Sequence, residues 1–299
     1  MKKNIILLMT AVFGVFVLAG CSEDDLKKTS AVLDSPTVEN DFDRWLTKNY
    51  LEPYNIDFKY RFKDVLGDMD YNLTPADYGQ AIKLAKLTLH LTLQVYDEVT
   101  GNRQFISENF PKIVHVIGSP AYNENNNIVL GVAEGGKMMT LYQVNIIDYL
   151  LETKNIDQLN ELFFKTMHHE FGHILHQTRP YSTDFNAVTP SSYVGDACFD
   201  TYRTDAAARQ AGFITRYSSK APDEDFVEQL SLYVTSTAAR WAEWEDILAQ
   251  GGSAGRPLLE QKNDIMRAYM LSTWDINIDE LRKVVLRRQN EIWSLDYNI

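Results

Sequence analysis

Four of the chain's six histidines fall close together in the segment FKTMHHEFGHILHQT, at positions 164–178: His168, His169, His173 and His176. Residues 169–173 read H-E-F-G-H and match the pattern H-E-x-x-H. On a helix, positions i and i+4 lie one turn apart on one face, so the imidazoles of His169 and His173 can bind one zinc ion together. Glu170 would stand beside a water molecule on that ion and could take its proton. The spacing therefore predicts a site for one Zn²⁺ per chain, with Glu170 as general base.

A catalytic zinc ion needs a third protein ligand and keeps one position open. On a straight helix His176 lies about 10.5 Å along the axis from His169, whereas zinc–nitrogen bonds are only about 2.1 Å long. His168 points about 100° away from His169 and is a weaker candidate still. The metzincin pattern is excluded, because it requires glycine at position 176 and histidine at position 179, where this chain has His176 and Arg179.

Two glutamates on a second predicted helix are the remaining candidates. Glu224 and Glu228 stand at positions i and i+4 in the segment EDFVEQLSLYV, so they share one helix face. Glu224 could approach the zinc ion from the side. Glu228, one turn later, could accept a hydrogen bond from a histidine ring and fix its tautomer. Position alone leaves open that both glutamates are solvated surface charges.

The helix that carries the histidines is predicted to start near Asn155 or Asp157 and to run to the end of the opening segment. Its apolar residues recur at helical spacing and form one buried stripe: Leu159, Phe163, Met167, Phe171 and Ile174. His169 and His173 point away from that stripe. Gly172 costs about 1 kcal/mol against alanine in a helix interior. We therefore expect another chain segment to pass close to it, with the space over the metal as one candidate.

The remaining elements follow from periodicity and from start and stop signals. The second helix is predicted over residues 221–244, with Pro222 and Asp223 near its start. Further helices are predicted at residues 41–55, 72–99, 257–274 and 277–295, the second of these with Thr74 as N-cap and Pro75 at its first position. Strands are predicted at residues 54–62 and 111–119, with a hairpin over residues 126–145. Residues 179–196 read as a loop and residues 251–255 as a chain break.

Taken together, the elements run from strands to helices, with the histidine helix at the junction, an order that suggests an α+β fold. The two histidines outside the opening segment lie in predicted core elements. His90 is surrounded by leucines in a helix, and His115 stands within a compact apolar strand. Both are interpreted as structural residues.

The composition limits the classes of partner. The formal net charge is −12 at pH 7, and it becomes −14 if residues 1–20 are removed with their two lysines. An acidic chain argues against nucleic-acid binding and against electrostatic adhesion to anionic membranes. The two cysteines are Cys21 and Cys198. If Cys21 is acylated, no disulfide framework is possible, and the fold depends on its hydrophobic core.

The N-terminal segment has the pattern of a secretory signal: Lys2 and Lys3, then an apolar run at residues 5–18 that is short for a membrane span. It ends in LAGC, which resembles a bacterial lipobox and implies cleavage before Cys21 and lipidation of that residue. The acidic stretch CSEDD resembles the export signal of surface lipoproteins in Bacteroidetes. We expect a signal peptide at 1–20, a flexible tether at 21–40 and one domain at 41–299. The alternative to the lipobox is an ordinary secretory signal in which Cys21 is coincidental. The alternative to the export signal is a solvated tether that carries no sorting information.

The segment HEFGHILHQ, followed some fifty residues later by EDFVE, resembles the gluzincin metallopeptidases of the lethal-factor type. The segments LEPYNIDFKYR and GFITRYSS extend a closer resemblance, to the "putative zinc-binding metallopeptidase" lipoproteins of Bacteroidetes, which are often encoded near SusC/SusD-type glycan uptake systems. The resemblance implies a zincin-like α+β fold with a small mixed sheet, an active-site helix and C-terminal helices. It also implies that Glu224 is the third zinc ligand and that Glu228 lies behind the ligands as a hydrogen-bond partner. Tyr217 would donate a hydrogen bond to the oxyanion that forms during peptide hydrolysis. Tyr193 and Tyr202 are alternatives for Tyr217.

The leading hypothesis is a surface-anchored outer-membrane lipoprotein that hydrolyses peptide bonds with a zinc-bound water activated by Glu170. Its expected partners are a peptide or protein substrate, the membrane through the lipid on Cys21, and neighbouring SusC/SusD-type components. The alternative is a catalytically weak accessory lipoprotein that captures glycan or peptide beside an uptake system. A purely structural zinc is disfavoured, because such sites usually have four protein ligands.

Overall fold

The computed structural model describes residues 39–63, 66, 71–122, 128–129, 131–134, 136–236 and 244–299. Residues Asn40–Ile299 form one compact unit. The predicted signal peptide, Cys21 and nearly all of the predicted tether lie outside the described residues. Among the helices that are described, none combines the length and the apolar character needed to cross a membrane.

The first helical segment is continuous from Asp41 to Tyr54 and consists of α2 (Asp41–Leu46), the π-helical turn η1 (Thr47–Leu51) and α3 (Glu52–Tyr54). Asn40 caps its start, because the Asn40 side chain accepts a hydrogen bond from the backbone of Asp43. Asn55 ends it in the left-handed conformation. The helix predicted over residues 41–55 is confirmed.

A four-stranded sheet has the order β1-β2-β6-β5, with bounds β1 (Asp57–Lys59), β2 (Ile113–Val116), β6 (Met138–Leu141) and β5 (Gly131–Glu134). The first three strands are parallel, and β5 pairs antiparallel with β6 at the edge. A separate pair joins β3 (Ala121–Tyr122) to β4 (Ile128–Val129). The predicted α+β class, small mixed sheet, strands and hairpin are confirmed.

The order of strands before helices is wrong, because a helical crossover separates β1 from β2, as parallel pairing requires. It contains α4 (Tyr78–Thr88), the π-helical turn η3 (Leu89–Leu93), α5 (Gln94–Thr100) and α6 (Gln104–Asn109). The predicted start at Thr74 and Pro75 is also wrong. The backbone carbonyl of Thr74 accepts from Gly118 at 2.9 Å, and Pro75 forms a bridge with Ile117. This pairing keeps the backbone extended until Asp77, whose side chain caps α4.

Between the sheet and the histidines lie η4 (Val144–Ile146) and α7 (Ile147–Glu152). The histidine helix is continuous over α8 (Ile156–Leu159), the π-helical turn η5 (Asn160–Phe164) and α9 (Lys165–Thr178). Asn155 is its N-cap, and its side chain accepts from the backbone of Gln158. The helix expected from Asn155 to residue 178 is therefore confirmed.

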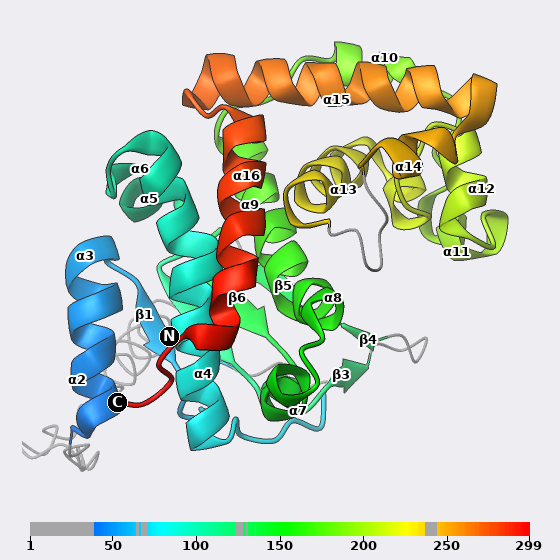
Figure 1. The fold of residues 1–299 in the computed structure, drawn as a ribbon. Coiled ribbons are helices and arrows are strands. Elements are labelled where there is room, and N and C mark those ends of the chain that lie inside the picture. The colour runs from blue at the N-terminus through cyan, green and yellow to red at the C-terminus, as the bar shows by residue number, and fades with distance from the viewer. Residues whose placement is uncertain are drawn as a thin grey trace, which may run out of the picture. The chain divides into compact units, whose positions relative to one another are not determined.

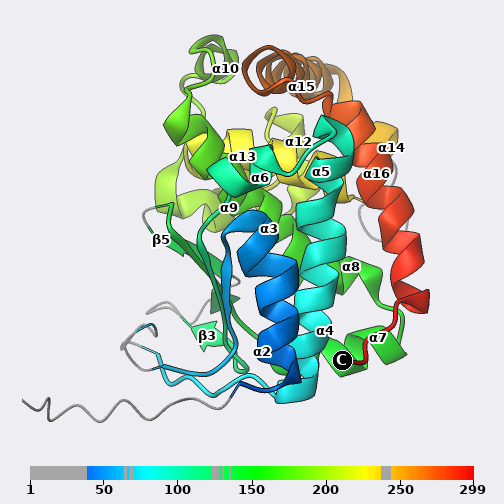
Figure 2. The ribbon, with the colours of Figure 1, turned by 90° about the vertical axis from the view of Figure 1, so that its left-hand side faces the viewer.

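The C-terminal part is helical: α10 (Asp184–Val188), η6 (Gly195–Ala197), α11 (Cys198–Thr201), α12 (Asp205–Gln210), η7 (Tyr217–Lys220), α13 (Pro222–Thr235), α14 (Trp244–Ala249), α15 (Gly252–Trp274), α16 (Ile278–Glu291) and η8 (Ile292–Ser294). In Figure 1, α15 runs along α10, α12, α13 and α14, with which it is in contact. Figure 2 shows the C-terminus beside α4, where Lys86 Nζ donates to the carbonyl of Asp296.

Three expectations for this part need correction. The predicted loop at 179–196 contains α10, and the helix predicted over 221–244 ends at Thr235, with residues 237–243 outside the described part. The predicted break at 251–255 is where α15 begins. Gly255 lies inside that helix. A larger residue does not fit there, because an added Cβ would lie 1.9 Å from the carbonyl oxygen of Arg209. The glycine serves close packing against α12 rather than a chain break.

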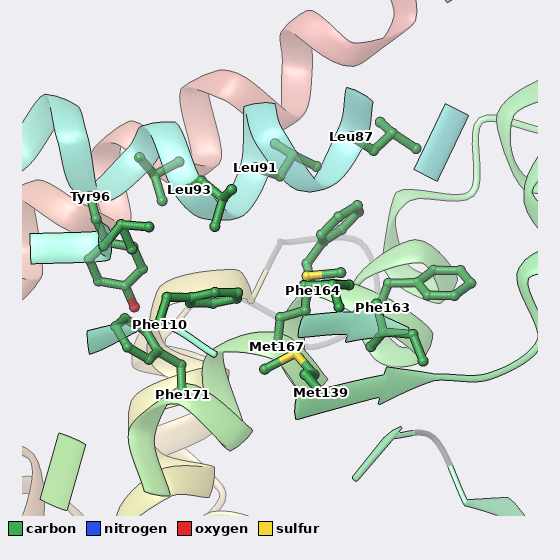
Figure 3. Packing of buried hydrophobic residues seen from close by; sticks show 14 of the residues in the cluster. Leu87, Leu91, Leu93, Tyr96, Phe110, Met139, Phe163, Phe164, Met167 and Phe171 are labelled. Atoms are coloured by element: carbon green, nitrogen blue, oxygen red, sulfur yellow. The ribbon is translucent and has the colours of Figure 1, made fainter. Parts of the chain in front are cut away.

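The main hydrophobic core lies between the crossover helices, the sheet and the histidine helix. Figure 3 shows Leu87, Leu91 and Leu93 from the crossover facing Phe164 and Met167 from the histidine helix. All five side chains are buried. The predicted apolar stripe of the histidine helix is thus the face that packs into this core.

Candidate metal centre

Helices α9 and α13 pack against each other and lie side by side in Figure 1. The helices meet tightly at Gly172, where an added Cβ would lie 3.0 Å from Val227 Cγ1 and 3.2 Å from Leu230 Cδ2. The absence of a side chain at Gly172 therefore lets α13 come close to the histidine face of α9. The expected close segment is α13 itself, the helix that carries the two candidate glutamates.

Three predicted ligands converge between these helices. Glu224 Oε2 lies 3.2 Å from His169 Nε2 and 3.3 Å from His173 Nε2. The three side chains can offer ligand atoms that all lie within 4.8 Å of one another. A tetrahedral zinc ion with bonds of about 2.1 Å separates its ligand atoms by about 3.4 Å. Two imidazoles and a carboxylate at these distances fit a zinc ion, and three protein ligands leave one position of a tetrahedral ion for a non-protein ligand.

Glu228 stands behind His169 and is held by three partners. His169 Nδ1 donates to Glu228 Oε1 at 3.0 Å, which leaves Nε2 on the side of the ring that faces Glu224. Lys165 Nζ donates to both carboxylate oxygens, at 2.7 and 2.9 Å, and Thr215 Oγ1 donates to Oε2 at 2.7 Å. Glu228 is buried, so these contacts replace the water that its charge would otherwise need.

The charges around His169 favour a cation at this position. Burial lowers the pKa of His169, but its hydrogen bonds with Glu224 and Glu228 raise that pKa to about 9. Burial raises the pKa of Glu224, but the hydrogen bonds from His169 and His173 hold it well below its ordinary value. The carboxylates thus stabilise positive charge between the rings, and a metal ion that replaces the proton would gain the same attraction.

The other two histidines of the cluster lie outside the three-residue group. His176 Nε2 is 3.0 Å from His173 Nδ1, so His176 lies behind a candidate ligand. His168 is fully buried on the core side, where its Nδ1 is hydrogen-bonded to the hydroxyl of Tyr96 at 3.0 Å. Burial lowers the pKa of His168 to about 4, so its ring is neutral near pH 7. Helix geometry had predicted that neither shares the ion.

Of the three candidate tyrosines, Tyr217, on the 3-10 turn η7, is the one that contacts a candidate zinc ligand. Its hydroxyl donates to Glu224 Oε1 at 3.1 Å, and its ring lies 6.1 Å from that of His169. Burial, followed by the charge of Glu224, raises the pKa of Tyr217 well above its ordinary value. The phenol therefore keeps its proton at neutral pH and remains a hydrogen-bond donor.

The two alternative tyrosines and the two histidines outside the cluster lie elsewhere. The hydroxyl of Tyr193 donates to Asp225 at 2.9 Å, and Tyr202 packs on Phe213. His90 lies 3.3 Å from the carbonyl of Arg288, and His115 is fully buried on β2. Glu170 is half-buried and follows His169 directly on α9.

Two residues of the centre were missed in the sequence, Lys165 and Thr215. The signal for Lys165 was available, since it stands four residues before His169 and so on the same helix face. Thr215 offered no such signal. It reaches Glu228 through a turn between α12 and η7 whose path depends on the tertiary fold.

Comparison with known proteins shows the family of the chain. A family model described as "putative zinc-binding metallo-peptidase" matches residues 35–279. The chain is also similar to a crystal structure described as a putative zinc-binding metallo-peptidase from Bacteroides caccae, with 38% sequence identity and a TM-score of 0.73. That similarity covers 86% of this chain and 95% of the other. Among curated proteins there is no match.

Proposed function

The chain belongs to this zinc-binding metallopeptidase family, and we propose that it hydrolyses peptide bonds at the centre formed by His169, His173 and Glu224. The observation that carries this proposal is the convergence of Glu224 Oε2 on the Nε2 atoms of His169 and His173. Glu170 follows His169 directly on α9. A zinc ion held there would polarise a substrate carbonyl and lower the pKa of a water molecule.

The protein's own residues would then move the protons. Glu170 accepts the proton of the attacking water and later passes it to the leaving amine. Tyr217 donates to the oxyanion that develops on the substrate carbonyl, for which its hydroxyl must turn away from Glu224 Oε1. Glu228 keeps the His169 ring in the tautomer whose Nε2 lone pair faces the centre.

We further propose that the enzyme is held at the outer membrane by a lipid on Cys21 and faces the cell surface. The LAGC motif and the acidic residues that follow it support this proposal. A peptide or protein substrate and neighbouring SusC/SusD-type components are the proposed partners.

The decisive experiment is the variant Glu170→Gln. It should retain one zinc ion per chain, because Glu170 is not one of the proposed ligands, while the rate of peptide cleavage falls by about 10²–10⁴-fold. Zinc content and cleavage of a complex peptide mixture would be measured for both proteins. Glu152→Gln, an exposed glutamate on α7, is the matched control and should leave both quantities unchanged.

Two outcomes would reject the proposed mechanism or the proposed activity. Cleavage by Glu170→Gln at the parent rate would remove Glu170 from the mechanism. A parent protein that binds zinc but cleaves no peptide would instead support the accessory role in glycan or peptide capture.

A further inference from the structure

Four charged or ligating side chains from α9 and α13 interleave at the metal centre. On α9, Lys165 and His169 are four residues apart, and on α13 the same spacing separates Glu224 from Glu228. Each residue pair therefore lies on one helix face. Glu228 lies between Lys165 and His169 and is within hydrogen-bond distance of both.

The Lys165 ammonium group sets the orientation of the Glu228 carboxylate. Its Nζ contacts Oε1 at 2.7 Å and Oε2 at 2.9 Å, so both oxygens are fixed relative to one donor. Oε1 then also accepts from His169 Nδ1, and Oε2 also accepts from Thr215. A carboxylate held at both oxygens cannot rotate without losing one of these bonds.

Burial sets this ion pair apart from most others of the described chain. The side chain of Glu228 is 4% exposed and that of Lys165 is 18% exposed, whereas in the pair of Lys83 with Asp148 the values are 31% and 45%. A carboxylate so deeply buried needs a compensating charge. The Lys83 pair is partly exposed to solvent, which screens it, so it is a suitable reference for an ordinary ion pair.

From these contacts we propose that Lys165 is a positioning residue of the metal centre: it holds Glu228 so that Oε1 accepts the Nδ1–H of His169 and the Nε2 lone pair faces the metal. The inference rests on the proposed zinc site. Lys165 acts through Glu228, to which its Nζ donates at both carboxylate oxygens. Outer hydrogen-bond partners of this kind typically contribute about 10–100-fold to metal affinity.

The test measures zinc affinity of the full chain by competition with a chromophoric chelator, independently of catalysis. Lys165→Met should weaken zinc binding about 10–100-fold. Lys165→Arg, which keeps the charge and the donors, should stay within a few-fold of the parent. Lys83→Met removes the partly exposed reference pair and should leave zinc affinity unchanged. The visible absorption of the Co²⁺-loaded protein should change in Lys165→Met and not in Lys83→Met, because only the former alters the setting of His169.

A purely structural role predicts a different result. Lys165→Met would then lower the unfolding midpoint of the metal-free protein while zinc affinity and the Co²⁺ spectrum remain those of the parent, and this would overturn the inference. If Lys165→Met does not fold, Lys165→Gln keeps a donor without the charge and takes its place, with the same expectation of weakened binding. A parent chain that binds no zinc would reject the proposed function, whereas equal binding by parent and variant would reject only the role of Lys165.

Discussion

Helix α9 packs against the aromatic core with one face and against α13 with the other, and the two faces are held by different forces. On the core face, Phe171 meets the rings of Tyr96, Phe105 and Phe110 at centroid distances of 5.3, 5.7 and 5.1 Å. On the α13 face, His169 is held by hydrogen bonds within a network of opposite charges. Burial of apolar area stabilises the first face, and pairing of buried polar groups stabilises the second.

The comparison shows that different residues of one helix stabilise the fold and form the candidate metal centre. The core face fixes where α9 lies, because close-packed rings tolerate little displacement. The α13 face fixes how the His169 ring is turned, because a hydrogen bond at Nδ1 selects its tautomer. Variants on the two faces should therefore fail in different measurements.

The largest expected effect on stability is that of Phe171→Ala on the core face. Removing this fully buried ring should lower the free energy of unfolding by about 3–5 kcal/mol, since the neighbouring rings cannot fill the space. Denaturant unfolding of the metal-free protein measures the loss. Zinc affinity of the fraction that remains folded should stay close to that of the parent. A variant that keeps its stability but loses zinc would break the separation between the two faces.

Adjacent histidines on the two faces should respond to pH with opposite signs. Burial lowers the pKa of His168 to about 4 from an ordinary value of 6.5. The unfolded chain therefore binds a proton that the folded chain does not. The resulting stability is complete above pH 6.5 and falls by about 3 kcal/mol as the pH drops from 6.5 to 4. His168→Gln cannot titrate and should show a shallower decline over this range.

His169 supplies the opposite slope in the metal-free protein. Burial lowers its pKa, but the hydrogen bonds with Glu224 and Glu228 together raise it to about 9. Its contribution to stability is therefore complete below pH 6.5 and is lost as the pH rises to 9. Urea midpoints measured from pH 4 to 9 in chelator would report both slopes. Identical acid slopes for the parent and His168→Gln would show that His168 is not buried as described.

Much of this arrangement could be predicted from the sequence because it depends on local spacing. The helix period placed Phe171 on one face and His169 on the other, and the same period put Glu224 and Glu228 on one face of α13. Geometry along a straight helix also set His176 apart from the candidate ligands, and it lies behind His173. These inferences need no knowledge of how distant segments meet.

The remainder depends on tertiary contacts that no local pattern encodes. Thr74 and Pro75 carry strong helix-start signals, yet backbone pairing with the segment at Ile117 and Gly118 keeps them extended. Thr215 reaches Glu228 only because the chain after α12 folds back over α13. The burial of Glu228 also results from the packing of the helices. Because Glu228 is buried, its charge needs a partner, which Lys165 supplies.

The smallest expected effect is that of Gly172→Ala, at the contact where the site helices meet. The new methyl group removes the glycine cost of about 1 kcal/mol in a helix, but it would lie 3.0 Å from Val227 Cγ1. Because overpacking costs about 1–3 kcal/mol, the net loss of stability should be about 0–2 kcal/mol. Zinc affinity should fall a few-fold, since α13 must move by a few tenths of an ångström and carries Glu224 with it.

A double-mutant cycle with Val227→Ala separates the two contributions to the effect of Gly172→Ala. Val227→Ala alone opens a cavity and should destabilise the protein. Added to Gly172→Ala, it removes the atom that the new methyl group meets, so the combined loss should be smaller than the sum of the single losses by at least about 0.5 kcal/mol. Zinc affinity in the double variant should return toward the parent value. Additive losses would mean that Gly172 serves the conformation of α9 alone, and that the close approach of α13 does not depend on it.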